Sequence, residues 1–387
     1  MRIKVLFFKS PNLMLKKLVL NDFRNYADLR LDFAEPTGLT YMIGDNGQGK
    51  TNILEAIYML ALAKSFRSAD EGNLIKWDAE FGRIQGYFEG NESPNREMEI
   101  FLGRPPQPKK IFKVNQVKSS AVNFVGLTRV VFFHPEDLNV LYLGPDLRRR
   151  YLDIMILQKS RAYFAALRAY KRVRAQRNAL LTAIKDRRAS ESDLEVWDNQ
   201  LVKEGSLIWK MRAETIQYID QELSAKYMEI SGRGAELHVE FKNSLGLDFP
   251  TISTAQNIEE LYRNELQMVR KREILSEHTL IGPHRDDMDI FLNGRALLTH
   301  ASRGEFRTTF LAMKLIEMEY FSRDGKRPLL LLDDVFSELD HERQRFLLEK
   351  VVHYQTFITT TKDSVNINRE RLLAGNFVEI KHGKALK

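Results

Sequence analysis

Apolar and polar positions alternate over short stretches in the first part of this chain, up to about residue 144. Alternation of this kind, bounded by glycine, proline and asparagine, is typical of β-strands. One stretch instead has apolar residues at helical spacing, and it follows a short apolar strand directly. The pattern predicts a mixed α/β unit with a helix over 52–60 and strands over 15–20, 29–33, 38–43, 98–102 and 111–114.

The pattern changes after Pro145, where apolar residues recur at helical spacing to about residue 232. Because glycine and proline are nearly absent there, we expect long helices that form an inserted arm. A strand over 237–241 and a helix ending near residue 271 follow. From residue 276 the α/β pattern returns, with strands over 328–334 and 356–361. The expected domains are a head formed by 1–144 and 276–387, and a helical arm formed by 145–275.

The composition excludes several classes of protein. No apolar run reaches the roughly 18 residues that suggest a transmembrane helix. The lack of cysteine excludes disulfides, thiolate catalysis and cysteine-ligated zinc, and it fits the reducing cytoplasm, where we expect this protein to act. With 387 residues, 43% hydrophobic and 29% charged, the chain can form two or three units with their own cores. Lys9 interrupts the basic and apolar start, so we expect no signal peptide.

A formal net charge of +7 favours a polyanionic partner. The excess is largest in the first half of the helical stretch, where only Asp153 and Asp186 oppose a long series of basic residues. The series comprises Arg148, Arg149, Arg150, Lys159, Arg161, Arg168, Lys171, Arg172, Arg174, Arg177, Lys185, Arg187 and Arg188. Such a run is either a solvated helix face or a surface that follows the phosphates of DNA. The charges alone leave both interpretations open.

A glycine-rich octet, Gly44-Asp45-Asn46-Gly47-Gln48-Gly49-Lys50-Thr51, lies between the strand over 38–43 and the helix over 52–60. It has the form of a phosphate-binding loop, whose glycines let backbone N–H groups converge on a polyphosphate. We expect Lys50 to bind the β- and γ-phosphates and Thr51 to bind Mg²⁺. A glycine-rich turn without a ligand is the alternative. The strand, loop and helix order favours a nucleoside triphosphate site.

Two carboxylates, Asp333 and Asp334, end a strand of consecutive leucines. This is the pattern of a Walker B motif, in which Asp333 would hold Mg²⁺ through water and Asp334 would polarise the attacking water. A core strand followed by a capped turn is the alternative. About 280 residues separate Lys50 from Asp333, so a large insertion divides the nucleotide-binding unit.

The segment Ser302-Arg303-Gly304-Glu305 begins an amphipathic helix just before that strand. Taken alone, Ser302 and Glu305 form an ordinary capping box. However, this segment, the Walker B strand and Ser337-Glu338-Leu339-Asp340 follow the order of signature motif, Walker B and D-loop in ABC-type ATPases. A signature helix presents backbone N–H groups and a serine hydroxyl to a γ-phosphate held by another subunit. ATP would then hold a homodimer together.

Over nearly its whole length the chain resembles the RecF family of bacterial recombination mediators. The matching segments are 21–26, 44–52, 64–67, 133–138, 148–153, 176–181, 281–287 and 332–340. The most specific are Gly-Pro-His-Arg-Asp-Asp at 282–287 and Asp-Asp-Val-Phe-Ser-Glu-Leu-Asp at 333–340. The resemblance implies an ABC-type P-loop ATPase head assembled from both chain ends, related to SMC-like ATPases, with a helical arm between them.

The resemblance also implies roles for single residues. Arg24 and Asn25 would lie near the nucleotide, and Glu136 would stand where relatives keep a Q-loop glutamine. A turn after a strand is the alternative for Glu136. Arg67 would face the composite site or DNA, or it is simply a solvated residue at a helix end. For 282–285, a structural turn is the alternative to a ligand role.

The implied function is an ATP-gated DNA-binding switch in recombinational repair and replication. Two subunits would sandwich ATP and Mg²⁺, bind duplex and single-stranded DNA near gaps, and help to load recombinase with RecO and RecR. An importer ATPase subunit, which would not need a basic arm, and a structural SMC-like head are the alternatives.

Two departures from related ATPases predict slow hydrolysis. Asp334 is one methylene shorter than the glutamate common in transporters, and Thr359-Thr360-Thr361 stands where they keep a switch histidine. A third departure is at the start of the chain. The family pattern begins near Met14, so we expect residues 1–13 to be an extra start segment.

Overall fold

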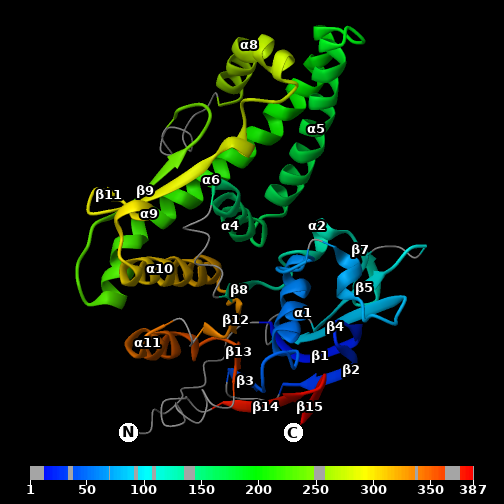
Figure 1. Cartoon of the computed structure of the whole chain (residues 1–387), viewed down its shortest axis with the longest axis vertical. Helices are drawn as coiled ribbons and strands as arrows, with labels where there is room; N and C mark the ends of the chain where they lie inside the picture. Colours follow the sequence, from blue (N-terminus) through cyan, green and yellow to red (C-terminus); the bar gives the residue numbers. More distant parts are fainter. Residues whose placement is uncertain are drawn as a thin grey trace. The chain divides into compact units, whose positions relative to one another are not determined.

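The structure is a computed structural model that describes residues 13–33, 38–68, 70–90, 95–106, 110–134, 144–247, 258–335, 339–361 and 375–386. The chain forms two compact units. The first unit joins residues up to 137 with residues from 317 onward, and the second unit comprises 138–316. Figure 1 follows the chain through each unit by colour.

An antiparallel sheet of six strands belongs to the first unit, in the order β2-β1-β4-β5-β6-β7. Its strands are β1 (Met14–Phe23), β2 (Tyr26–Asp32), β4 (Phe81–Glu89), β5 (Arg96–Gly103), β6 (Lys110–Val114) and β7 (Val117–Ser119). Every second residue of β4 is buried, as expected for a sheet with one covered face. A Cβ atom on Gly86 would come within 2.6 Å of Leu60 Cδ1, so this glycine allows helix α1 (Lys50–Leu62) to pack closely on the sheet.

The second sheet of this unit has the order β15-β14-β3-β13-β12-β8. Its strands are β3 (Leu39–Ile43), β8 (Val130–Phe133), β12 (Leu329–Asp333), β13 (Thr356–Thr360), β14 (Asn376–Lys381) and β15 (Lys384–Leu386). All pairings from β14 to β8 are parallel, and every residue of β8 and β12 is buried, which explains their unbroken apolar runs. Because β3 and β8 precede the insertion and β12 and β13 follow it, this fold is assembled from both chain ends. The predicted fold class is therefore confirmed.

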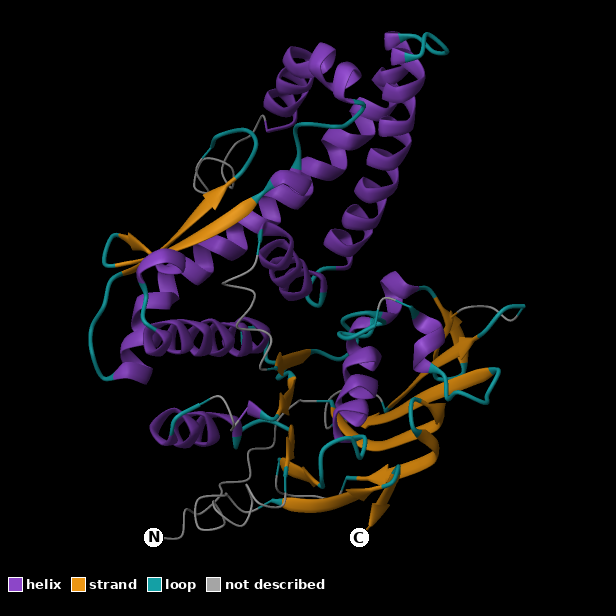
Figure 2. Ribbon diagram, viewed as in Figure 1, coloured by secondary structure: helices purple, strands orange, loops and turns teal. Residues whose placement is uncertain are grey.

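Helix α1 contacts strands of both sheets of the first unit. It is buried without interruption from Ile53 to Leu62, because a helix covered on both sides must be apolar on all faces. The described part of the unit also contains shorter helical elements: η1 (Glu71–Leu74), α2 (Ala121–Phe124) and α11 (His341–Val351). Figure 2 shows α1 in purple among the orange strands of this unit.

The second unit is mainly helical. Its long helices are α4 (Pro145–Leu157), α5 (Arg161–Lys185), α6 (Leu194–Ser231), α8 (Ile258–Ser276) and most of α10 (Arg303–Ser322). A three-stranded sheet, β11-β10-β9, packs beside them and consists of β9 (Leu237–Lys242), β10 (Asp287–Leu292) and β11 (Arg295–Ala296). The short elements are η3 (Glu191–Asp193), η4 (Pro283–Arg285) and α9 (Leu297–His300). None of the helices in the described segments is both long and apolar enough to span a bilayer.

The compact units divide the chain at 137/138 and 316/317, whereas the sequence predicted domain boundaries at 144/145 and 275/276. The difference at the later boundary has a structural cause. Strand β10 pairs with β9 over six residues, and this pairing holds 287–292 in the same unit as the helices. The assignment of residues 276–316 to an ATPase head remains a prediction about function.

Candidate nucleotide site

The predicted phosphate-binding loop connects β3 to α1. Gly47 and Gly49 have φ angles of 80° and 109°, a backbone region that side chains disfavour. A Cβ atom on Gly49 would also lie 2.5 Å from Asn25 Nδ2 and 2.8 Å from the Tyr26 hydroxyl. The loop therefore requires glycine at Gly49 for both its conformation and its close packing.

Lys50 is the first residue of α1, and it is buried. Its Nζ donates hydrogen bonds to the carbonyl oxygens of Gly44 at 2.6 Å and Asp45 at 2.8 Å. Burial lowers the pKa of Lys50, while the nearby carboxylates of Asp334, Asp333 and Asp45 act in the opposite direction. The ammonium group thus lies on the loop, near Asp333, the carboxylate predicted to hold the metal, and near Asp334, the residue predicted to polarise water.

Thr51 and Asp333, which are far apart in the sequence, meet in the structure. The Thr51 hydroxyl donates to Asp333 Oδ1 at 3.0 Å, and the Thr359 hydroxyl donates to the same oxygen at 2.6 Å. His134 Nε2 lies 3.6 Å from Asp333 Oδ2. A hydroxyl and a carboxylate are oxygen ligands that suit Mg²⁺, which keeps waters and phosphate oxygens in its remaining positions. Thr51 and Asp333 therefore fit the predicted metal site.

Asp334 follows directly and has a left-handed backbone, with φ at 48°. Its N–H donates to the Thr359 hydroxyl at 3.0 Å. Strain of this kind in a non-glycine residue is often found at functional sites. Among the described residues, no group of three or more His, Asp or Glu side chains is placed to hold a metal ion.

A polar cavity of about 390 Å³ lies over the loop and contains the predicted catalytic pair, Lys50 and Asp334. Its lining consists of Asn46, Gly47, Gly49, Lys50, Thr51, Asn52, Arg67, His134, Asp333, Asp334, Thr359 and Thr361. The structure thus brings most of the loop and the Walker B pair to one place at the carboxyl end of the parallel strands, where such sheets commonly bind ligands. Asn52 and His134 were not predicted as site residues.

Arg24 and Asn25 differ in what they contact. Arg24 donates from Nε and Nη2 to the two carboxylate oxygens of Glu55, at 2.8 and 2.7 Å, and Glu55 is wholly buried. The contacts of Arg24 thus support a role in holding α1, and Arg24 does not line the cavity. Asn25 Nδ2 donates to Gln48 O at 3.0 Å, and Asn25 Oδ1 accepts from Asn52 at 2.8 Å. Asn25 thus holds the loop and the first turn of α1 in place.

Ser302 and Glu305 form the capping box that the sequence offered as the ordinary interpretation. The backbone N–H and the hydroxyl of Ser302 both donate to Glu305 Oε2 at 2.7 Å, and the Glu305 N–H donates back to the hydroxyl at 3.3 Å. These bonds lower the pKa of Glu305. Ser302 and Gly304 are nevertheless exposed at the start of α10, a helix of 20 residues. Both residues are therefore at the surface, although the Ser302 hydroxyl is bonded to Glu305 and the Gly304 carbonyl accepts from the Thr308 hydroxyl at 2.9 Å.

The segment at 282–287 is a structural turn in the second unit. Gly282 has φ at 142°, and a Cβ atom there would overlap the hydroxyls of Tyr170 and Tyr262. His284 Nδ1 lies 2.8 Å from the Tyr170 hydroxyl and its Nε2 lies 3.0 Å from Thr279 O. Burial lowers the pKa of His284 to about 4, so the ring is neutral near pH 7. These contacts leave the ring with internal partners on both nitrogens.

Two arginines of the predicted basic surface are buried instead, and this corrects the expectation for them. Arg148 pairs with Asp287 at 2.6 Å. Arg177 is wholly buried and contacts Asp198 at 2.7 Å and Glu273 at 2.6 Å. Both carboxylates lie far along the chain from Arg177, which is why local charge counting missed them. On the same helix α5, exposed basic residues remain, among them Arg161, Arg168 and Arg172.

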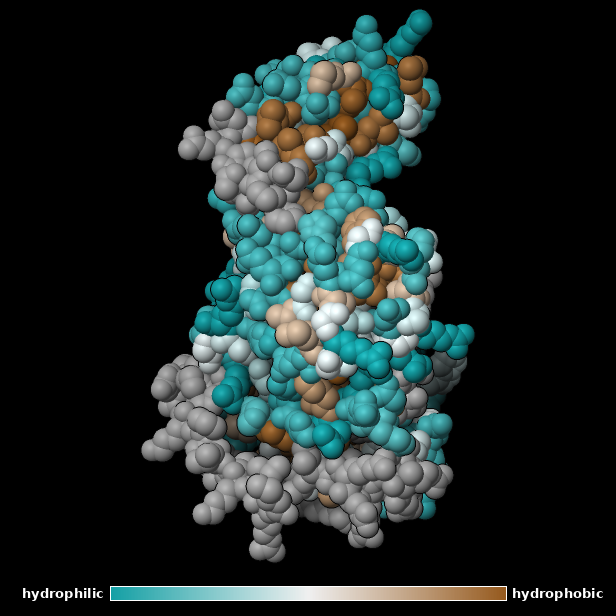
Figure 3. Space-filling model, turned by 90° about the vertical axis from the view of Figure 1, so that its left-hand side faces the viewer, coloured by the Kyte–Doolittle hydropathy of each residue, from teal (hydrophilic) through white to brown (hydrophobic). Residues whose placement is uncertain are grey.

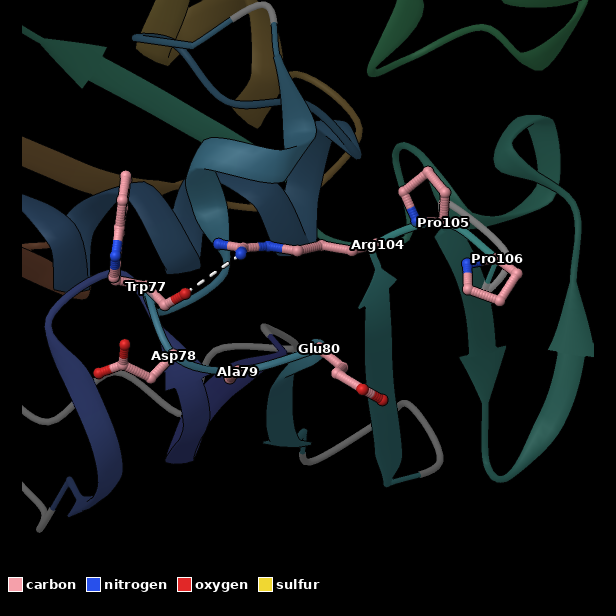
Figure 4. Close-up of a pocket in the computed structure, with 7 residues that line it drawn as sticks. All are labelled: Trp77, Asp78, Ala79, Glu80, Arg104, Pro105 and Pro106. Carbon is pink, nitrogen blue, oxygen red and sulfur yellow. Dashed lines mark hydrogen bonds between the residues drawn. The ribbon is translucent and has the colours of Figure 1, made fainter.

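A second hollow of about 290 Å³ in the first unit has none of the predicted site residues in its lining (Figure 4). It is lined by Trp77, Asp78, Ala79, Glu80, Arg104, Pro105 and Pro106. The Arg104 guanidinium donates to Trp77 O at 3.1 Å and so holds the turn that exposes Trp77, 86% of whose surface is accessible. This hollow contains none of the residues that are predicted to bind phosphate or metal in the larger cavity.

Some predicted residues lie outside the described ranges. These are Glu136, Ser337, Glu338 and residues 1–12. Asp340 is described, and its side chain caps α11 by accepting from the Arg343 N–H at 3.0 Å.

Comparison with known proteins agrees with this geometry. Residues 14–382 match the family described as RecF/RecN/SMC N terminal domain. The DNA replication and repair protein RecF of Bacillus cytotoxicus is 37% identical over 373 residues, which are 96% of this chain and 98% of that protein. RecF of Bacillus cereus strain G9842 is 36% identical with the same coverage.

Solved structures give the same result. A structure of the recombination mediator protein RecF with ATP, in the RecFOR pathway, has a TM-score of 0.88 and 32% identity. The match covers 98% of this chain and 99% of that one. The Smc head domain of Pyrococcus furiosus, with a TM-score of 0.53 and 16% identity over 96% of this chain and 95% of that one, shares the fold.

Proposed function

This chain belongs to the RecF family of DNA replication and repair proteins, and we propose that it is an ATP-gated DNA-binding switch. The observation that carries the proposal is the meeting of Thr51 with Asp333 beside Lys50, in a cavity large enough for a triphosphate. The relative solved with ATP supports adenine as the base.

ATP would occupy the cavity with its phosphates on the loop. The backbone N–H groups of the loop and of the first turn of α1 would donate to phosphate oxygens, and Lys50 would move from the loop carbonyls to the β- and γ-phosphates. Mg²⁺, when bound, would neutralise charge on the phosphates from its position at Thr51 and Asp333. Thr359 would keep the Asp333 carboxylate oriented through its 2.6 Å hydrogen bond.

Hydrolysis is proposed to be slow. Asp334 lies at the cavity and can accept a proton or orient water there, but its side chain is short for that task. Its left-handed backbone further limits where the carboxylate can reach. A turnover above roughly 10 s⁻¹, the median of enzymes in general, would contradict a switch and favour a motor.

ATP is proposed to close a homodimer. Ser302 and Gly304 are exposed at the N-terminus of α10, where backbone N–H groups and the helix dipole favour an anion. They would bind the γ-phosphate of ATP held by a second subunit. The loop of one copy and the signature segment of the other would then form one composite site.

DNA is proposed to bind through the phosphate backbone. The exposed arginines of α5 can contact phosphates without reading bases, so binding would be independent of sequence and sensitive to salt. Duplex and single-stranded DNA near gaps would be the target, and RecO and RecR would be the partners that help load recombinase. The solved relatives named within the RecFOR pathway support this assignment.

A structural SMC-like head is the second candidate, because the Smc head shares the fold. The experiment that separates the two is ATP hydrolysis with and without gapped DNA, using Lys50→Met as the inactive control. We expect gapped DNA to raise hydrolysis severalfold in the wild type and to leave Lys50→Met at background. Hydrolysis and dimerisation that are indifferent to DNA would favour the scaffold.

A further inference from the structure

Helix α8 of the second unit has an apolar stripe on its solvent side. Leu261, Met268 and Leu275 have 41%, 69% and 71% of their surface exposed, although the opposite face is buried through Tyr262 and Leu266. The three exposed residues are spaced by seven, so they lie almost in line along the helix. Figure 3 shows hydrophobic residues, in brown, at the surface in the upper part of the view, where Figure 1 draws α5, α6 and α8. We call these three residues the α8 stripe.

Charged residues of opposite sign stand along one edge of the α8 stripe. Glu265 follows Leu261 by four positions and Arg272 follows Met268 by four, so both lie on the same edge. Neither side chain forms a hydrogen bond or ion pair with another described residue. The edge is thus acidic toward the start of the helix and basic toward its end.

We propose that α8 packs antiparallel against α8 of a second copy of this chain, about a two-fold axis at Met268. In this arrangement Met268 meets its own counterpart and Leu261 meets Leu275 of the second copy. Glu265 then faces Arg272 of the second copy, and symmetry forms this pair twice. A helix whose edge is acidic in one half and basic in the other is complementary to itself only when it is reversed.

A parallel pair would be opposed by charge. In a parallel coiled coil, a residue at the Glu265 position faces the residue five positions earlier on the other helix. That residue is Glu260, so two carboxylates would come together twice. The charges of Glu260, Glu265 and Arg272 therefore favour the antiparallel orientation of the two helices, while the α8 stripe supplies the contact area.

The contact is small. From Leu261 to Leu275 the stripe is about 21 Å long at the helical rise of 1.5 Å per residue. Three apolar side chains cover much less than the roughly 800 Å² per partner of a standard stable interface, so the association is weak on its own. It therefore forms at high protein concentration without nucleotide, and it is strengthened when two copies are also held together elsewhere, because the second contact is then intramolecular. This contact is separate from the ATP-dependent dimer and does not require nucleotide.

Disulfide trapping tests the register. The chain contains no cysteine, so introduced thiols are the only ones present. In the full chain without nucleotide, we expect diamide to crosslink Met268→Cys into a covalent homodimer. Leu261→Cys and Leu275→Cys alone stay monomeric, since each lies about 20 Å from its own counterpart, and the two variants mixed together crosslink. Gln267→Cys, which is also exposed but lies off the stripe, is the matched control.

Sedimentation equilibrium without nucleotide tests the charge pairing. Glu265→Arg and Arg272→Glu, made singly, are each expected to raise the dimer dissociation constant about tenfold. The two combined in one chain restore it to within about threefold of the wild type. Equal crosslinking of every single cysteine, or a double variant no tighter than the single ones, would overturn the proposal. A Met268→Cys variant that stays monomeric would also overturn it, and would indicate that part of the same chain covers the stripe.

Discussion

Charged side chains that line the candidate nucleotide cavity are held differently from the arginines buried in the second unit. At the nucleotide cavity of the first unit, Lys50 contacts loop carbonyls and Asp333 contacts the hydroxyls of Thr51 and Thr359. In the second unit, Arg177 and Arg212 are buried against carboxylates, and Arg212 lies 2.7 Å from both Asp153 and Asp286. A charged side chain with neutral partners can still attract a charged ligand, whereas one paired with an opposite charge is already neutralised. The comparison separates residues that serve a ligand from residues that serve the fold.

The largest effect on stability is expected from Arg177→Met. The change leaves the buried carboxylates of Asp198 and Glu273 without this partner, and breaking a buried ion pair from one side costs about 3–5 kcal/mol. The free energy of unfolding, measured in urea, should fall by that amount. The control is Arg172→Met on the exposed side of the same helix, which should change it by less than about 0.5 kcal/mol. A loss below about 1 kcal/mol for Arg177→Met would show that the pair is solvated.

A pH dependence of stability is expected from His284. Burial lowers its pKa to about 4 in the folded chain, whereas the unfolded imidazole has a pKa near 6.5, so the unfolded state binds more protons between these values. Stability from this group is complete above pH 6.5 and is lost as pH falls toward 4, by up to about 3 kcal/mol.

Asp286, in the same turn, acts in the opposite direction. Burial raises its pKa to about 7, so its contribution grows as pH falls from 7 toward 4. The measurement for His284 is therefore the difference between the wild type and His284→Gln across this range. A constant difference would contradict the assignment to the imidazole.

A smaller effect on stability is expected from Ser302→Ala. Loss of the capping box should cost about 1 kcal/mol, while ATP-induced dimers should disappear. Ser302→Asn keeps a good capping residue, so its free energy of unfolding should be close to that of the wild type. It should nevertheless fail to form dimers with ATP, as measured by light scattering with and without ATP. Dimers that survive in Ser302→Ala would refute the composite site.

The smallest effect on stability is expected from Lys50→Met. Burial of the ammonium already lowers its pKa, so its removal should leave the unfolding free energy within about 0.5 kcal/mol or raise it slightly. ATP affinity, measured by calorimetry, should instead fall at least about 100-fold, because the phosphates lose their charged partner. A large loss of stability would place Lys50 among the residues that serve the fold and would weaken the comparison.

Short motifs made the centre of the nucleotide site predictable. The loop octet and the two aspartates carry their chemistry within a few residues. The residues predicted from them, Lys50, Thr51 and Asp333, line one cavity, and their roles in it remain predictions. Thr359 was named in the sequence only as a residue that replaces a histidine. Its contact with Asp333 depends on parallel pairing of β12 with β13, which sets Asp333 opposite Thr359. The pairing of two strands that are distant in the sequence cannot be predicted from the sequence of either strand alone.

Other features were hidden for different reasons. Strand β4 was not predicted because Gly82 and Gly86 lower its strand propensity, although both glycines allow close packing on a neighbour. Arg177 looked like one charge of a basic surface, since its partners Asp198 and Glu273 lie far along the chain. Polar residues whose partners are distant are therefore the least predictable part of this protein.

The parallel sheet of the first unit has a consequence for synthesis on the ribosome. Strand β3 is made early, but its neighbour β13 is completed only at Thr360, after the whole second unit has been translated. Strand β8 likewise cannot pair with β12 until β12 has been translated. Contacts between such distant segments form slowly, and unpaired apolar strands are prone to aggregate meanwhile. A nascent chain stopped before residue 328 would thus carry a complete phosphate loop in an unfinished sheet, a state in which chaperones would be needed most.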